Sequence, residues 1–561
     1  MSTPASPSRQ SITTTLSEPV DRAYEGTEAL TIDGWALAPA QVAEFAHRHG
    51  ATARLDPCAR ARMLSSVRMR ERLLDAGERV YGMTTGFGDS VRRSVSPEHA
   101  AILQRNLILG HLCGSGPPAC REVTRATMLI RANCLARGHS GIRPKVVELL
   151  LALLQRDLTP VVPSRGSLGA SGDLIPLAYV AATLLGQGTI DHENTHVPAS
   201  EALRAHGLEP IVLEAREGLA LINGTAFSAG FAVVALAAAR RLAHAADAAT
   251  ALAVAALHGN PDHFDERLHR HKGHTGQQHS ASGIRATLRG LVLARASTLQ
   301  DPYSLRCAPH VIGVLHDTLD WAETWLRTEV NSSTDNPLFD PAVPNAMHGG
   351  HFYAGHIGHA MESVKLAVAN VADLLDRQVE LLVDEKFNRG LTPNLVTHHP
   401  DRPARAGDET HALEDGHASA RDDPAVHHGM KASQIACSAL TAETLQAAMP
   451  AMVFSRSSEA HNQDKVSMGT TAARQALEVC RGATGVLAIQ LLAACQALDV
   501  RGTPLGNSTV ARLHATIRAR VPVLRADRRL DDAQDAVRTM IEAGLITPPS
   551  DTGGCDRGSP I

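Results

Sequence analysis

Apolar residues recur at every third or fourth position along most of this chain, within segments rich in Ala, Leu, Arg and Glu. This spacing puts the apolar side chains on one face of an α-helix, and these residue types favour helices. Alternating, strand-like segments are few. The pattern therefore predicts a mainly α fold, with helices at residues 59–76, 125–136, 144–154, 175–185 and 360–383.

The most apolar stretch, residues 231–257, is Ala-rich but contains Arg240, Arg241, His244 and Asp247. Charged groups are costly at the centre of a bilayer, so we expect a buried core helix here and no membrane span. Aromatic residues make up only 3% of the chain. The core must therefore be packed by Leu, Val, Ile and Ala, which suits close-packed helices.

Loops rich in Gly and Pro interrupt the helices at residues 81–90, 164–178 and 331–341, and such loops commonly carry functional groups. Residues 1–30 and 547–561 are rich in Ser, Thr, Pro or Gly and are predicted to be flexible tails. Residues 398–423 are polar and rich in His, Asp and Arg, so they are predicted to form a polar insertion.

Charge and cysteine content narrow the class of protein. Lys and Arg total 54 against 58 for Asp and Glu, which gives no basic surface for nucleic acid and favours a small-molecule substrate. The nine cysteines are odd in number and contain no C-x-x-C pair, so reduced thiols are expected. With a polar N-terminus that lacks an apolar signal core, this predicts a cytoplasmic protein.

The tripeptide Ala170-Ser171-Gly172 lies in a row of small residues, where the backbone can bend sharply. The Gly172 nitrogen can then approach the Ala170 carbonyl carbon and close a ring. Loss of water, including the Ser171 hydroxyl, would give a conjugated, electron-accepting alkene. Alone, however, such a tripeptide is common in plain turns.

Several further segments decide between these interpretations. GSLGASGDLIPLAYV (166–180) resembles the cofactor-forming segment of the histidine, phenylalanine and tyrosine ammonia-lyase and aminomutase family. The following segments also resemble the family's, in its order: YGMTTGFG (81–88), LQRNLILGH (103–111), LINGTA (221–226), LQDPYSLRCAPH (299–310), NSSTDNPLFD (331–340), GGHFYAGH (349–356) and EAHNQDKVSMG (459–469).

This resemblance implies a histidine ammonia-lyase-like fold with a long central helical bundle. It divides the chain into an N-terminal lyase domain at 31–230, which carries the cofactor-forming loop, and a helical-bundle domain at 231–546. It further implies a homotetramer with each active site assembled from three subunits. No shielding domain like that of plant and fungal phenylalanine lyases is recognised, so the bacterial type is the better comparison.

The expected reaction removes a weakly acidic β-hydrogen and expels a poor leaving group, so it needs an electrophile as well as a base. The resemblance implies that Ala170, Ser171 and Gly172 form 4-methylidene-imidazol-5-one (MIO), which accepts the substrate amine. Tyr81 matches the catalytic tyrosine that takes the β-proton. Its ordinary pKa of about 10 is too high for a base at neutral pH, so neighbouring groups would have to lower it.

Other positions match groups that bind the substrate. Arg306 matches the arginine that grips the carboxylate through two parallel hydrogen bonds. Asn223, Tyr303 and Asn336 match positions that hold the substrate or the new ring carbonyl, and Tyr303 is also counted as catalytic. Gln300 and Phe352 correspond to further pocket positions.

Two places in the family follow the substrate side chain. Gly110-His111 occupies the pair that is Ser-His in histidine lyases and Phe-Leu in plant phenylalanine lyases, and His111 can hydrogen-bond a phenol or an imidazole. Gln463 stands where histidine lyases carry glutamate, and Glu459 resembles the amine-contacting glutamate of phenylalanine lyases. This combination favours tyrosine, with phenylalanine and histidine as alternatives.

Two other functions stay open. An aminomutase would use the same site and return ammonia to the β-carbon, which depends on how long the Tyr81 loop stays closed. A non-catalytic homologue is disfavoured because Tyr81, Ser171 and Arg306 are all retained.

The His-rich stretches do not have the spacing of a metal site, and no metal is predicted. The sequence departs from the family pattern at His351, where asparagine is usual, and at Thr275, where proline is usual.

Overall fold

The computed structural model describes residues 29–292, 298–397 and 426–549. Of these residues 59% are helical and 6% lie in strands, which confirms the mainly α fold. The predicted tails and the insertion at 398–423 lie outside the described residues, except for residues 29, 30 and 547–549. The division into domains at residue 230 remains a prediction.

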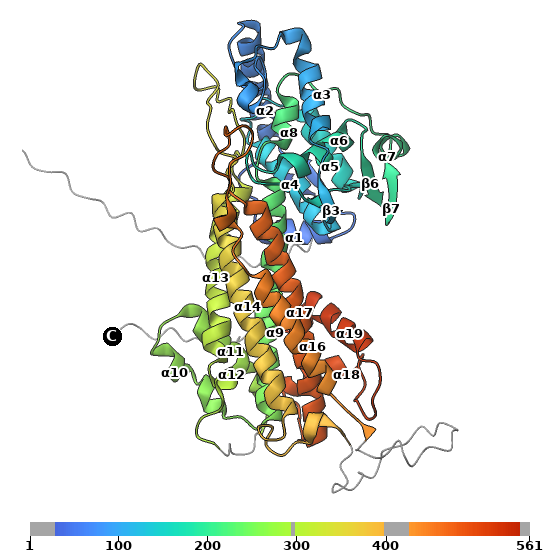
Figure 1. Ribbon diagram of the computed structural model, residues 1–561, viewed down its shortest axis with the longest axis vertical. Coiled ribbons are helices and arrows are strands. Elements are labelled where there is room, and N and C mark those ends of the chain that lie inside the picture. The colour runs from blue at the N-terminus through green and yellow to red at the C-terminus, as the bar shows by residue number, and fades with distance from the viewer. Residues whose placement is uncertain (1–28, 293–297, 398–425, 550–561) are drawn as a thin grey trace, which may run out of the picture.

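The molecule is elongated, with short helices and small sheets at one end and a bundle of long helices at the other (Figure 1). The longest helices of the bundle are α9 (Ala226–Ala256), α13 (Ala308–Val330), α14 (Gly355–Val383) and α17 (Gly469–Arg501). Shorter helices lie along them: α10 (Glu266–Arg270), α11 (Thr275–Leu288), α12 (Tyr303–Arg306), α16 (Lys431–Ala447), α18 (Thr509–Arg518) and α19 (Asp531–Glu542).

The other end is built mainly from residues 29–225. Its α-helices are α1 (Pro39–His47), α2 (Pro57–Asp75), α3 (Ala100–Gly110), α4 (Arg121–Ala136), α5 (Pro144–Gln155), α6 (Leu174–Leu184), α7 (Ala199–Ala205) and α8 (Glu217–Ile222). It also contains the 3₁₀ helices η1 (Gly88–Arg92) and η2 (Pro97–His99), whereas η3 (Pro261–Phe264), η4 (Pro393–Leu395) and η6 (Met452–Phe454) come later in the chain. The five helices predicted from the sequence are all present, with ends shifted by a few residues.

The strands are short and form three separate small sheets within the described residues. They are β1 (Leu30–Ile32), β2 (Ala53–Leu55), β3 (Ser115–Pro118), β4 (Thr159–Pro160), β5 (Pro163–Arg165), β6 (Thr189–His192) and β7 (Thr195–Pro198). Strands β1 and β2 pair in parallel, β3 and β5 pair antiparallel, and β4, β6 and β7 form an antiparallel sheet in that order. Because β5 leads directly toward α6, its pairing with β3 fixes one end of the loop that carries Ser171.

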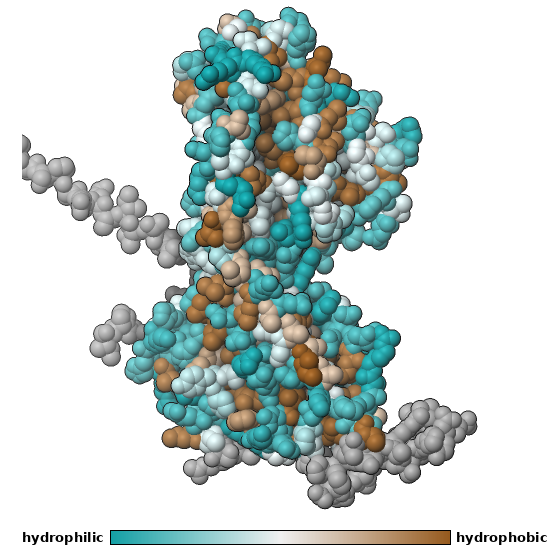
Figure 2. Space-filling view, viewed as in Figure 1, coloured by the Kyte–Doolittle hydropathy of each residue, from teal (hydrophilic) through white to brown (hydrophobic). Residues whose placement is uncertain are grey.

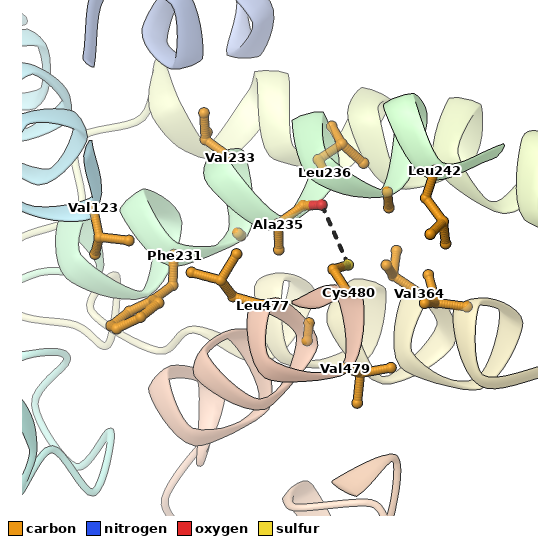
Figure 3. Close-up of a cluster of buried hydrophobic side chains, with 14 of the residues drawn as sticks. Val123, Phe231, Val233, Ala235, Leu236, Leu242, Val364, Leu477, Val479 and Cys480 are labelled. Carbon is orange, nitrogen blue, oxygen red and sulfur yellow. Dashed lines mark hydrogen bonds between the residues drawn. The ribbon is translucent and has the colours of Figure 1, made fainter. Parts of the chain in front are cut away.

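Helices α9 and α17 form the centre of the bundle. Both are long and apolar enough to cross a membrane, but 72% and 89% of their most apolar windows are buried inside the protein. Figure 3 shows Phe231 of α9 beside Leu477 of α17 and Leu242 of α9 beside Val364 of α14, while the Cys480 thiol donates to the Ala235 carbonyl oxygen at 3.7 Å. The predicted core helix at 231–257 is therefore confirmed.

Local signals in the sequence explain where several helices begin and end. The Asp56 carboxylate accepts from the backbone nitrogens of Cys58 and Ala59, and so caps the first turn of α2. Helix α17 ends at Gly502, whose φ of 63° is easily adopted by glycine and whose N–H donates to the Leu498 carbonyl oxygen.

Candidate active site

The loop between β5 and α6 brings Ser171 against the turn that joins α8 to α9. The Asp173 nitrogen donates to the Gly224 carbonyl oxygen at 2.7 Å. Gly172 has a φ of +73°, and a Cβ atom there would lie 2.2 Å from the Gly224 oxygen. Only glycine permits this approach, so the row of small residues allows the two backbones to meet.

Asn223 lies at the end of α8, and its amide points at the same loop. Its Nδ2 donates to the Ser171 carbonyl oxygen at 3.1 Å. Asn223 is buried, and its Oδ1 has no hydrogen-bond partner among the described residues. A fixed donor aimed at a carbonyl oxygen stabilises negative charge that develops there.

The segment before α17 approaches the loop from another side. The Gln463 Nε2 donates to the Ser171 Oγ at 2.9 Å. The Ser467 nitrogen donates to the Gly169 carbonyl oxygen at 3.3 Å. Residues that are 292 positions apart in the chain thus meet at one hydroxyl.

Asp173 was not singled out from the sequence, although it directly follows the tripeptide. Its carboxylate is fully buried and accepts from the Ser228 nitrogen at 2.7 Å, from the Ser228 Oγ, from the Thr470 Oγ1 and from the Ser167 Oγ. Burial raises its pKa, while the hydrogen bonds from Thr470 and Ser228 act in the opposite direction. The carboxylate joins the first turns of α6, α9 and α17, and so holds the loop in position.

Tyr81 belongs to a loop that lies beside Glu459. The Tyr81 hydroxyl oxygen accepts from the Gly88 nitrogen at 2.8 Å, and the Asp89 nitrogen donates to the Glu459 Oε1 at 3.2 Å. A Cβ atom on Gly88 would overlap the Glu459 carboxylate. The loop is tied to α3, since the Gln104 side chain donates to the Gly82 carbonyl oxygen at 2.9 Å.

The pKa of Tyr81 is raised within one chain. Burial is the main cause and the nearby Glu459 charge adds to it, whereas the Gly88 hydrogen bond and Arg216 oppose it. This direction is opposite to the one required of a base at neutral pH. The groups described in a single chain therefore do not supply the lowering of the pKa that we expected from the sequence.

Asn336 and Phe352 lie in the segment that follows α13. The Asn336 Oδ1 accepts from the Gly349 nitrogen at 2.8 Å, and the neighbouring His348 accepts from the Tyr81 nitrogen at 3.4 Å. Phe352 is half-buried, and the adjacent Tyr353 hydroxyl donates to the Val466 carbonyl oxygen at 3.4 Å. This segment thus lies between the Tyr81 loop and the segment before α17.

His111 ends helix α3 and is half-buried. Its Nδ1 lies 2.7 Å from the Leu107 carbonyl oxygen. Because a carbonyl oxygen can only accept, Nδ1 carries the proton in the neutral ring, and Nε2 remains an acceptor. The imidazole can therefore accept a hydrogen bond from a substrate that carries an N–H or O–H group on its ring.

Gln300, Tyr303 and Arg306 lie at the opposite end of the bundle. The Arg306 guanidinium stacks over the Tyr303 ring at 4.5 Å, and its Nε donates to the Asp301 carbonyl oxygen at 2.9 Å. A hollow of about 390 Å³ beside Arg306 is lined by several basic side chains. Tyr303 is 72% exposed.

The length of α13 gives the distance between Arg306 and the region around Ser171. The helix begins directly after Arg306 and Cys307, and its last residue precedes the segment that holds Asn336. At a rise of about 1.5 Å per residue, its 23 residues span about 34 Å. The structure therefore brings Ser171, Asn223, Tyr81, Glu459 and Gln463 into one region, but it does not bring Arg306 to them within one chain.

Known proteins resemble this chain over most of its length. The family model for aromatic amino acid lyases matches residues 37–519. A histidine ammonia-lyase of Gloeobacter violaceus is 39% identical over 527 residues, which is 93% of this chain and 97% of that protein.

Solved structures agree in fold. Tyrosine aminomutase from Streptomyces globisporus is 32% identical, has a TM-score of 0.84, and covers 92% of this chain and 98% of its own. Histidine ammonia-lyase from Trypanosoma cruzi is 30% identical, has a TM-score of 0.81, and covers 92% of this chain and 94% of its own.

Proposed function

Because this chain belongs to the aromatic amino acid lyase family and is a carbon–nitrogen lyase, we propose that it eliminates ammonia from an aromatic L-amino acid with a hydrogen-bond donor on its ring. Histidine is the leading substrate and tyrosine the second. The observation that carries this proposal is His111, whose Nδ1 is occupied by the Leu107 carbonyl oxygen and whose Nε2 is an acceptor.

The residues around Ser171 fit an internal MIO group made from Ala170, Ser171 and Gly172. Gly172 and Gly224 lie too close for any side chain at position 172, and the Asn223 amide already contacts the Ser171 carbonyl oxygen, which would become the ring carbonyl. Such a group supplies an electrophilic alkene that makes the substrate nitrogen a better leaving group. Asn223 would stabilise negative charge on the carbonyl oxygen.

The other groups near Ser171 have roles that follow from their positions. The Tyr81 hydroxyl, as phenolate, removes the β-proton while the bond between the α-carbon and nitrogen breaks. Glu459 lies beside the Tyr81 loop, where its carboxylate can hold the substrate ammonium. Asn336 and Phe352 belong to the adjacent segment, which covers the site and excludes water from the reacting atoms.

Two lines of support point to different ring types. The relative from Gloeobacter violaceus is a histidine ammonia-lyase, and this similarity does not support the preference for tyrosine that we drew from the sequence. Gln463 favours tyrosine, because a neutral amide replaces the glutamate that suits an imidazole. Its amide donates to the Ser171 hydroxyl, however, so its hydrogen bond is used on the reacting loop. We therefore rank histidine first.

A substrate panel with a His111→Leu variant tests this proposal. We expect urocanate from histidine as the main product, and coumarate from tyrosine if the second candidate is correct. Loss of the Nε2 acceptor should lower kcat/KM for either substrate by about 10²-fold, because the ring donor is left unpaired. Turnover of phenylalanine should fall far less, since its ring has no donor.

Product analysis by mass spectrometry measures each outcome. An equal loss for all three amino acids would show that His111 does not read the ring. A β-amino acid as the main product would make the protein an aminomutase with the same binding site.

We also propose that the protein is a homotetramer whose active site combines Ser171 of one subunit with Tyr303 and Arg306 of another. The distance along α13 supports this, since Arg306 cannot reach Ser171 of its own chain. Apolar residues are visible among polar ones on the surface of the bundle (Figure 2). Leu366 of α14 is 65% exposed and Ile435 of α16 is 59% exposed. Association would bury such residues.

Mixed oligomers test the shared site. Ser171→Ala and Arg306→Ala should each be inactive alone, but random assembly of the two should leave about a quarter of the sites with both native residues. Co-produced variants should therefore recover about a quarter of the wild-type activity in a lyase assay.

The matched control pairs Ser171→Ala with Asn223→Ala. These two residues contact each other within one chain, so no mixed site can carry both native side chains. Recovery no greater than in this control would contradict a site shared between subunits.

A further inference from the structure

Three histidines from three bundle helices converge at a place that the proposed reaction does not use. They are His244 of α9, His279 of α11 and His316 of α13. Helix α9 begins at Ala226, directly after the turn that contacts the Ser171 loop. His244 lies 18 residues further, which is about 27 Å along the helix. The cluster is therefore remote from that region.

The spacing of the rings suits a single metal ion. One nitrogen of each histidine lies within 4.8 Å of the others, and the ring centroids are separated by 5.5, 5.3 and 4.5 Å. Three imidazoles bound tetrahedrally at about 2.0–2.1 Å would have ring centres about 5 Å apart and nitrogens about 3.4 Å apart. Small rotations of the side chains would close the remaining gap.

A buried carboxylate orients one of the three rings. The Asp247 Oδ2 accepts from the His316 Nε2 at 3.0 Å, and the Ser280 hydroxyl donates to the Asp247 Oδ1. Asp247 is fully buried in the Ala-rich helix α9. A carboxylate that holds one nitrogen of a histidine is the usual second partner of a metal ligand, and here it leaves Nδ1 as the nitrogen of His316 that a metal ion would bind.

The other two rings have nitrogens available for a ligand. Within the described residues, neither the His244 nor the His279 imidazole has a hydrogen-bond partner. An imidazole nitrogen without a hydrogen-bond partner can bind a metal ion.

The surroundings allow a cation to enter. His244 borders a hollow of about 460 Å³ at the surface of the bundle. Arg240, which lines the same hollow, pairs with Asp320 at 2.8 Å and Glu323 at 2.6 Å, so its charge is neutralised locally. Asp247 adds one buried negative charge.

We propose that His244, His279 and His316 bind one divalent transition-metal ion of the zinc type, with Asp247 orienting His316 and water as the fourth ligand. Within the described residues the His244 and His279 imidazoles contact each other and His316 as rings, without a hydrogen bond to hold them. Three imidazole ligands suit Zn²⁺, Co²⁺ or Cu²⁺ better than Mg²⁺ or Ca²⁺. The ion would join α9, α11 and α13, which the sequence could not indicate because the histidines are far apart in the chain.

The test uses full-length protein without a histidine tag, treated with EDTA and desalted. Titration with Co²⁺ should give the visible absorption of a tetrahedral site, and Zn²⁺ should displace it. His279→Ala should lose one bound ion per chain and the visible absorption, because one of the three ligands is removed. We choose His279 because it is exposed, so its replacement carries little risk to the fold. Asp247→Asn should weaken binding by about 10-fold to 100-fold.

His359→Ala is the matched control, since His359 is an exposed histidine of α14 outside the cluster. It should bind Co²⁺ as the wild type does. Zn²⁺ should raise the Tm of the wild type and of this control but not of His279→Ala, because an ion that binds only the folded state stabilises it. Equal binding by His279→Ala, or an absorption typical of thiolate ligands, would overturn the proposal.

Discussion

Replacing Ser171 with alanine is expected to lower kcat/KM by about 10⁴-fold, or ~5.4 kcal/mol of transition-state stabilisation. The hydroxyl is the source of the alkene carbon, so the variant cannot form the electrophile. The Gln463 and Asn223 contacts to residue 171 show that the side chain and carbonyl are held on both sides. Steady-state kinetics with histidine and tyrosine measure the loss.

A measurement of the intact protein mass shows whether the Ser171→Ala variant is inactive because the electrophile is missing or because the protein is misfolded. The wild type should be lighter than its sequence mass by two waters, about 36 Da, and Ser171→Ala should show no such deficit. Ser167→Ala, in the same loop, removes one hydroxyl from Asp173 and should keep the deficit. A wild-type mass equal to the sequence mass, or an active Ser171→Ala variant, would exclude the proposed cofactor.

Replacing Tyr81 with phenylalanine is expected to lower kcat by about 10²-fold to 10⁴-fold, the usual contribution of a general base. The base must be deprotonated to act, and burial raises the pKa of Tyr81 above its ordinary value in one chain. The activity of the wild type should therefore rise with pH and level off only above this pKa. The variant should lose that rise and keep a flat, low rate.

Tyr179→Phe is the control for the loss of a hydrogen bond. The Tyr179 hydroxyl accepts from the Gly114 nitrogen at 3.1 Å, as the Tyr81 hydroxyl accepts from Gly88 at 2.8 Å. Both variants lose a similar bond, but only the Tyr81 variant should change the pH profile. If Tyr81→Phe keeps the wild-type dependence on pH, another group is the base.

If the activity of the wild type levels off at a pH well below the ordinary tyrosine pKa, cationic groups absent from the single chain lower the pKa of Tyr81. The region around Arg306 is a candidate source, because a hollow lined by basic side chains adjoins it.

The pattern along the chain was sufficient to predict five of the helices and the buried helix at 231–257. Residues 360–383 lie within α14 (Gly355–Val383), and the charged positions of residues 231–257 correctly indicated a buried helix. These predictions succeed because helix formation and burial depend on spacing within a few turns. The loops at residues 81–90 and 331–341 were found for a similar reason, since Gly and Pro end helices locally.

The sequence also determined which chemical groups are present, through the resemblance of Tyr81, Ser171 and Arg306 to a known set. It did not determine which of them share a region of one chain. Arg306 and Ser171 lie at opposite ends of the bundle, because rigid helices separate them by their own length. The sequence likewise did not predict the hydrogen bonds around Asp173 or the cluster of three histidines.

Both of these features join residues brought together only by the packing of helices. Asp173 and Thr470 are 297 positions apart, and His244, His279 and His316 come from three helices. No local pattern encodes such a meeting, because it depends on the angle and depth at which whole helices pack. The sequence by itself therefore determined the helices and the reactive groups, and only the tertiary structure decided which groups face one another.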